Sequence, residues 1–133
     1  MSTYLLDTSP LTAYLMGYRK ATSLIALWIA SNEVATSILV YGEAYEFVRG
    51  FANFTVMHAQ LQDLLLGPIP AYNLTFGILA RYANLRRSLR PSNSLIGDID
   101  TLIVATAMEY GLTVVTANQN HFQRPPGLNV LPY

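Results

Sequence analysis

The stretch "GDIDTLIVATAMEYGLTVVT", residues 97–116, decides the fold of this chain. It opens on two aspartates, Asp98 and Asp100, and then runs for about three helical turns with almost no polar side chain. This pattern predicts a buried helix over 99–110 that ends at Gly111. The β-branched run that follows predicts a strand over 112–116. A buried helix leading directly into a buried strand is typical of an α/β protein.

The rest of the chain repeats this alternation. In the stretch "TYLLDTSP", residues 3–7 form a predicted strand, Ser9 is the predicted helix cap and Pro10 the first helical residue. The other predicted elements are an apolar helical patch at 24–29, strands at 33–37, 68–72 and 128–131, and helices at 38–49, 53–66 and 74–90. We therefore expect one domain over residues 1–133, an α/β fold with a short, mostly parallel central sheet and right-handed crossovers.

The composition limits the possible functions. Eight Lys and Arg balance eight Asp and Glu, so no overall field draws the chain to nucleic acid or to an acidic membrane, and any polyanion site must be local. The chain has no cysteine, which excludes disulfides and thiolate chemistry and fits a reducing cytoplasm. The longest apolar run is far shorter than a bilayer span, and the N-terminus lacks the basic region of a signal peptide. We expect a soluble, cytoplasmic protein that does not bind membranes.

Acidic and amide side chains are expected to meet at one edge of the sheet. Asp7 ends the first strand, and Glu43 lies about two turns into the helix after the second strand. The helix 99–110 runs antiparallel to the strand after it, so Asp98 and Asp100 return to the edge where Asp7 lies. Asn118 leaves the last of these strands at the same edge. Carboxylates gathered in this way repel one another unless a cation lies between them, and oxygen ligands suit Mg²⁺ or Mn²⁺.

Each of these residues also has an ordinary structural interpretation. An aspartate at a helix start is commonly a cap, and for Asp98 we favour that interpretation over direct metal ligation. Asp7 also fits a turn residue, and Glu43 a solvated helix residue with Glu46 as its competitor on the same face. The order of the residues along the chain, more than any one of them, carries the prediction of a metal site.

Four stretches carry a resemblance to a known family: "YLLDTSPLTAYL", "TSILVYGEAYEF", "IGDIDTLIVATAMEYGLTVVTANQNHF" and "RPPGLNVLPY". They resemble the successive motifs of the PIN domain, in particular the VapC toxins of bacterial and archaeal toxin–antitoxin pairs. The resemblance implies a three-layer α/β/α fold and an endoribonuclease that needs Mg²⁺ or Mn²⁺ and leaves 5′-phosphate and 3′-hydroxyl ends. The catalytic positions implied are Asp7, Glu43, Asp100 and Asn118. As metal ligands we expect Asp7, Glu43 and Asp100, together with Asp98 acting through a water molecule.

Two residues depart from the family pattern. Asn118 stands where PIN domains often have aspartate, so we expect a single bound ion, with Asn118 acting through water. His121 stands before Phe122, where an acidic residue is common. We interpret His121 as an exposed loop histidine, ahead of the alternatives that it contacts a phosphate or carries a proton.

The partners follow from the resemblance and from the small number of charges. Apolar surface left on such a domain predicts a homodimer and a groove for an antitoxin segment, lined by Leu11, Tyr14, Leu15, Tyr45 and Phe47 unless these residues are core. The main alternative function is a PIN-like module that binds RNA or protein without cleaving it, because Asn118 removes one charge. A phosphatase of the haloacid dehalogenase class is disfavoured, since its DxD motif follows a strand and the one in this chain opens a helix.

Overall fold

Five short strands form the centre of the structure, a computed structural model in which residues 2–133 are described. All neighbouring strands are parallel, and their order in the sheet is β3-β2-β1-β4-β5. The strands are β1 (Tyr4–Leu6), β2 (Val34–Ser37), β3 (Ala71–Tyr72), β4 (Thr113–Thr116) and β5 (Val130–Pro132). The expected α/β fold with a parallel sheet is confirmed.

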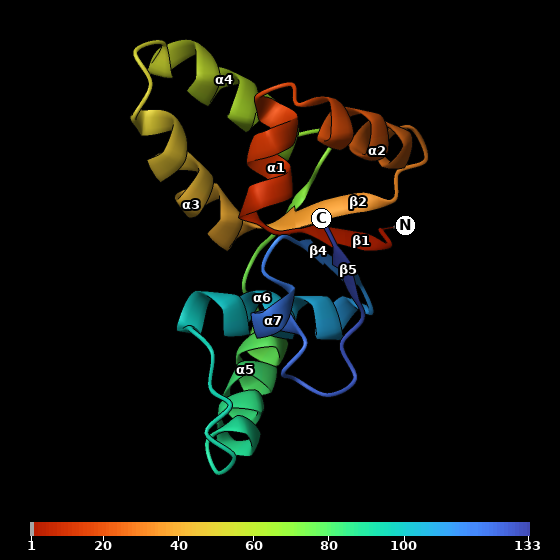
Figure 1. Ribbon diagram of the computed structural model, residues 1–133, viewed down its shortest axis with the longest axis vertical. Helices are drawn as coiled ribbons and strands as arrows, with labels where there is room; N and C mark the ends of the chain where they lie inside the picture. The colour runs from red at the N-terminus through yellow and green to blue at the C-terminus, as the bar shows by residue number, and fades with distance from the viewer. Residues whose placement is uncertain (1) are drawn as a thin grey trace.

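Helices cover both faces of this sheet. Figure 1 shows α1 to α4 on one side of the strands and α5 to α7 on the other, which gives three layers. The helices are α1 (Thr8–Leu15), α2 (Arg19–Ala30), α3 (Ile38–Arg49), α4 (Phe54–Leu65), α5 (Phe76–Leu89), α6 (Asp98–Tyr110) and α7 (Gln119–Phe122). Among residues 2–133, none of these helices is both long and apolar enough to cross a bilayer.

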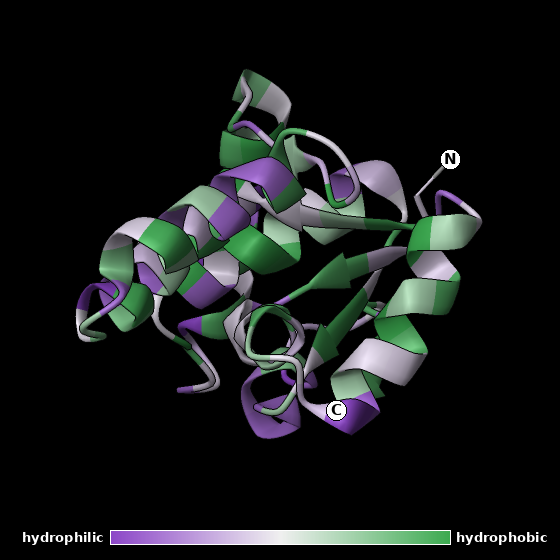
Figure 2. Cartoon of the chain, turned by 90° about the horizontal axis from the view of Figure 1, so that it is seen from above, coloured by the Kyte–Doolittle hydropathy of each residue, from purple (hydrophilic) through white to green (hydrophobic). Residues whose placement is uncertain are grey.

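The central strand β1 is buried on both faces of the sheet, so its apolar residues are consecutive and do not alternate with polar ones. Leu5 and Leu6 of β1 point to opposite faces and are both fully buried, because helices pack on each side. Helix α6 contributes Ile103 and Val104 to the same core, so it is buried around most of its circumference. In Figure 2 the strands are coloured mainly as hydrophobic, and the surrounding helices carry both colours.

A cap begins α3 and a glycine ends α6 where the sequence predicts. The Ser37 hydroxyl accepts a hydrogen bond from the Leu39 N–H at 3.1 Å and so caps α3. Helix α6 ends at Gly111, whose φ of 65° is left-handed and favours glycine. Strand β3 is shorter than expected, because it lies at the sheet edge directly after Pro70.

Two predicted helix starts are wrong, and one short helix was not predicted. Helix α1 begins at Thr8 with Asp7 as its cap residue, and not with Ser9, because the Asp7 carbonyl already accepts from the Leu11 N–H at 3.3 Å. Helix α2 begins at Arg19, before the apolar patch, because Ala21 also faces the core. The short helix α7 was not predicted, since its four residues are too few for a periodic pattern.

Candidate functional site

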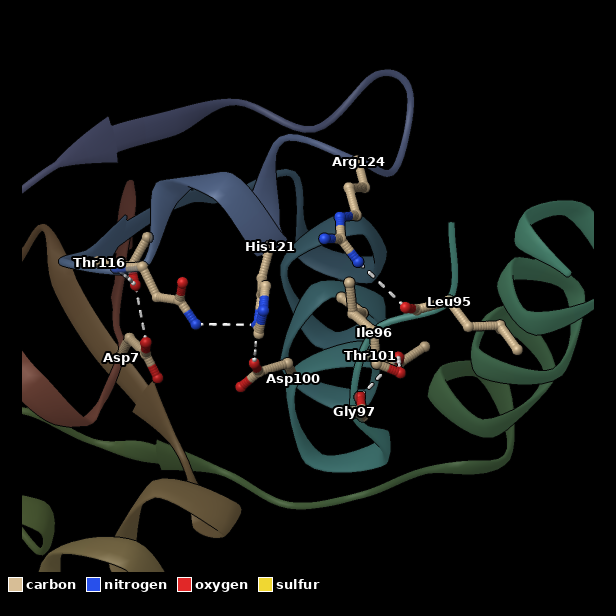
Figure 3. A network of polar contacts seen from close by, with 10 residues as sticks. Asp7, Leu95, Ile96, Gly97, Asp100, Thr101, Thr116, His121 and Arg124 are labelled. Atoms are coloured by element: carbon tan, nitrogen blue, oxygen red, sulfur yellow. Dashed lines mark hydrogen bonds and ion pairs between the residues drawn. The ribbon is translucent and has the colours of Figure 1, made fainter. Parts of the chain in front are cut away.

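Asp7 lies buried at the carboxyl end of the central strand β1, with only 8% of its surface exposed. The register pairs Leu6 with Val115, so Asp7 and Thr116 follow side by side at the ends of β1 and β4. The Thr116 hydroxyl, itself fully buried, donates to Oδ2 of Asp7 at 2.8 Å (Figure 3). This neutral donor orients the carboxylate and leaves its charge in place.

The charge on Asp7 is held at a cost in free energy. Burial raises the pKa of the Asp7 carboxyl, and the hydrogen bonds from the Thr116 hydroxyl and the Thr8 backbone offset part of that effect. The nearby charges of Asp100 and Glu43 raise the pKa further. Three carboxylates from separate segments therefore interact electrostatically at one edge of the sheet, as the sequence predicts.

Glu43 reaches the site from α3, the helix that begins at the end of β2. The Thr8 hydroxyl, on the first residue of α1, donates to Oε1 of Glu43 at 2.6 Å. Thr8 thus contacts both predicted acids, Asp7 through its backbone and Glu43 through its side chain. It fixes Glu43, and not the alternative Glu46, at this edge.

Asp100 closes the site from the first turn of α6. Its Oδ2 lies 3.2 Å from Nδ1 of His121, and the same Nδ1 lies 2.9 Å from Nδ2 of Asn118. The Asn118 backbone N–H donates to the Thr116 hydroxyl at 2.9 Å. These contacts run from Asp7 through Thr116, Asn118 and His121 to Asp100. Figure 3 shows Thr116 beside Asp7 and His121 beside Asp100. The interpretation of His121 as a loop histidine is therefore wrong.

Asp98 does not join this group, and its prediction as a metal ligand is not supported by its position. Its Oδ1 accepts from the Arg86 guanidinium at 2.5 Å and from the Tyr82 hydroxyl at 3.1 Å, both on α5. Residues two apart on a helix point in nearly opposite directions, so Asp98 and Asp100 cannot face the same spot. The opposite charge of Arg86 holds Asp98 on the outer side of α6.

The donor chemistry fits a divalent cation, although the side chains are not gathered around one point. Within residues 2–133, no three His, Asp or Glu side chains are close enough together to hold an ion as they stand. Each of the three acids is instead bound through one oxygen: Asp7 to Thr116, Glu43 to Thr8 and Asp100 to His121. Carboxylate oxygens of this kind, two of whose charges raise the pKa of Asp7, suit Mg²⁺ or Mn²⁺.

The two threonines, Thr8 and Thr116, are the site residues that sequence reasoning missed. Thr116 is found once β4 is placed next to β1, because it then follows the strand beside Asp7. Thr8 is found once α1 is known to start directly after Asp7. The order of residues alone does not reveal either threonine. The role of Thr116 depends on which strand pairs with β1, and the role of Thr8 depends on where α1 starts.

Comparison with known proteins agrees with this architecture. The family model described as the PIN domain matches residues 4–128. A comparison with curated proteins found no match.

Similar solved structures have the same fold. A chain of VapBC2 from Rickettsia felis bound to a DNA fragment from their promoter is 22% identical, with a TM-score of 0.85 and 98% of both chains covered. A chain of DNA-bound VapBC from Salmonella typhimurium is 18% identical, with a TM-score of 0.87, covering 99% of this chain and 98% of that one. A chain of a toxin-antitoxin complex from Klebsiella pneumoniae is 24% identical, with a TM-score of 0.72 and 98% of both chains covered. At these identities the likeness concerns the fold.

The raised pKa of Asp7 gives a prediction about stability without metal. The folded state keeps the Asp7 proton at pH values where the unfolded chain, with a pKa of about 3.9, has lost it. The free energy of unfolding therefore falls as pH rises through that window, by about 1.4 kcal/mol per pH unit. Asp7→Asn removes this loss, so in EDTA its stability advantage over wild type should grow from pH 4 to pH 8.

Denaturant unfolding monitored by circular dichroism measures this difference. Asp63→Asn, which neutralises an exposed acid on α4, is the control and should differ from wild type by the same small amount throughout. An advantage of Asp7→Asn that shrinks with rising pH would contradict the assignment of Asp7 as a buried, repelled carboxylate.

Proposed function

The chain belongs to the PIN domain family, and from this premise we propose that it is a metal-dependent endoribonuclease of the VapC toxin type, neutralised by a cognate antitoxin. The observation that carries the proposal is electrostatic. Asp7, Glu43 and Asp100 come from three separate segments, and the charges of the last two raise the pKa of the first. A fold that brings three acids to one edge of the sheet, within electrostatic reach of Asp7, gains stability when they turn toward a cation.

In the proposed site, Asp7, Glu43 and Asp100 hold one Mg²⁺ or Mn²⁺. When bound, such an ion lowers the pKa of a water molecule and polarises a phosphate. Thr116 and Thr8 orient the carboxylates of Asp7 and Glu43 through hydroxyl donors. Asn118, a neutral amide at the fourth catalytic position, lies farther out and contacts His121.

An RNA backbone is the proposed substrate. The overall charge is zero, so attraction for phosphates must come from a local group of cations. Arg86 contacts Asp98 at the start of α6, so this side of α5 lies beside the helix end that carries Asp100. Arg90 follows one turn later and, like Arg87, is exposed. We infer that these side chains, on the outer side of α6, supply the local positive charge that attracts a phosphate backbone.

The test of this proposal is cleavage of RNA by purified protein with Mg²⁺ or Mn²⁺. Asp7→Asn and Asp100→Ala should each reduce the rate by about 100-fold or more, because the bound ion supplies several kcal/mol and ~1.4 kcal/mol is a factor of ten. Asn118→Ala should cost less than Asp100→Ala, because it removes only an outer contact. Single-turnover cleavage, assayed with and without EDTA, measures each rate.

Asp63→Asn serves again as the control and should cleave like wild type. Binding of RNA by the wild type without any metal-dependent cleavage would support the alternative, a non-catalytic PIN-like module. Cleavage by Asp7→Asn at the wild-type rate would refute the assignment of the site.

The proposed antitoxin segment lies in a surface groove between α1 and α4. Tyr14 and Leu15 of α1 line it together with Gln60, Asp63 and Leu64 of α4. Leu11, which we had expected to line such a groove, is instead fully buried in the core, because it faces the sheet. The similarity to chains of toxin-antitoxin structures supports a partner protein of this kind.

Expression of the chain alone should arrest bacterial growth, and Asp7→Asn should abolish the arrest. Co-expression of the protein encoded by the adjacent small reading frame should restore growth. Leu15→Ala should keep the toxicity but weaken the rescue, whereas Leu27→Ala, at an exposed site on α2, should leave both unchanged. Colony counts under separate inducers measure these effects; harmless expression of a well-folded wild type would contradict the toxin assignment.

A homodimer is proposed from exposed apolar side chains at the end of α4 and at the start of α5. Phe76 is 95% exposed and Leu66 is 88% exposed, which is costly for a free surface. Leu66 and Ile38 line one groove, and Leu79 lies one turn after Phe76 on the same face of α5. A second copy of the chain would cover this surface.

Phe76→Ser should weaken the dimer by about 30-fold or more, because burying a phenylalanine is worth roughly 2 kcal/mol or more. Leu27→Ser removes another exposed apolar side chain, on α2 and outside this surface, and should leave the dimer intact. Sedimentation velocity over a dilution series measures the two dissociation constants. A wild type that stays monomeric at high concentration would contradict the proposal.

A further inference from the structure

His121 links two side chains of the site, Asp100 and Asn118. Its Nδ1 lies 3.2 Å from Oδ2 of Asp100 and 2.9 Å from the amide nitrogen of Asn118. The side chain is 41% exposed, whereas that of Asp100 is 22% exposed. Figure 3 shows the ring pointing from α7 toward Asp100. One ring nitrogen thus faces a carboxylate and an amide together.

The two neighbours determine which form of the ring satisfies both contacts. A carboxylate accepts hydrogen bonds only, so the contact with Asp100 requires that Nδ1 carries a hydrogen and donates it. The amide of Asn118 then presents its oxygen to the same N–H, since amide oxygen and nitrogen have the same shape. An Nδ1 lone pair would satisfy Asn118 but would repel Asp100.

The backbone around His121 keeps the ring in this place. Phe122, the next residue, is fully buried and anchors α7 to the core. The backbone N–H of His121 donates to the carbonyl of Asn118 at 3.2 Å, and the N–H of Asn118 donates to the Thr116 hydroxyl. Because Thr116 also binds Asp7, the position of the ring is fixed relative to both acids.

We propose that His121 is a positioning residue that donates from Nδ1 to Oδ2 of Asp100 and leaves the other oxygen of Asp100 free for the metal ion. This inference rests on the proposed metal-dependent function. Carboxylates that bind metals are commonly held by such outer hydrogen bonds, and the loss of one typically costs 10- to 100-fold in metal affinity. His121 stands at a position where the family commonly has an acidic residue. It therefore adds a hydrogen-bond donor that orders the site, and no further carboxylate.

The test compares the Mn²⁺ affinity of the wild type with that of four variants by calorimetric titration. His121→Ala should weaken Mn²⁺ binding by about 10- to 100-fold without lowering the melting temperature. His121→Asn places an amide N–H where Nδ1 stands and should recover most of the affinity. His121→Gln places its amide farther out and should not. Asn120→Ala, which truncates an exposed side chain on the same helix, is the matched control and should bind as wild type does.

A second measurement is independent of metal. Long-range ¹⁵N–¹H correlation spectra of the metal-free wild type should show a hydrogen on Nδ1 of His121. An unprotonated Nδ1, or unchanged Mn²⁺ affinity in His121→Ala, overturns this inference while the metal-dependent function stands. Tighter Mn²⁺ binding by His121→Ala also overturns it, because the ring would then oppose the ion as a cation. A wild type that neither binds Mn²⁺ nor cleaves RNA overturns the proposed function, and this inference with it.

Discussion

A carboxylate buried at the end of the central strand is the constraint on which the site depends. Removing a charge from water costs several kcal/mol unless other groups replace the lost hydration. For Asp7 these groups come from both flanks: the Thr116 hydroxyl from β4 and the backbone of Thr8 from α1. They do not cover the whole cost, because the pKa stays raised. The strand order, with β1 between β2 and β4, is what brings both flanks to this residue.

The same constraint explains how α6 can be buried and still begin with two acids. The N-terminal end of a helix is electropositive and stabilises carboxylates in its first turn. Asp98 and Asp100 both lie in that turn, but they point to different sides of the helix. Asp100 turns toward the site, and Asp98 turns toward Arg86 of α5. The sequence pattern of two nearby aspartates therefore produces one candidate ligand and one surface ion pair.

The elements with long apolar patterns could be predicted from sequence, and with them the meeting of Asp7, Glu43 and Asp100 at one edge. What could not be predicted depends on neighbours that are distant in sequence. The partner of Asp98 lies on α5, and the role of Thr116 requires knowing that β4 pairs with β1. His121 lies on a helix of four residues, too short to show a period, so its contact with Asp100 had no signal in the sequence.

The acids of this chain have two kinds of partner, a cation or a neutral hydroxyl, and the difference indicates the role of each acid. Asp98 is paired with the guanidinium of Arg86, which neutralises its charge and so weakens its attraction for any other cation. Asp7 and Glu43 are held by threonine hydroxyls, which fix their direction but leave their charges intact. A chain that needed only stability at this edge would gain more from an arginine or lysine beside Asp7 than from a threonine. Holding the acids with neutral donors keeps the edge anionic, which is the condition that a site for a divalent cation requires.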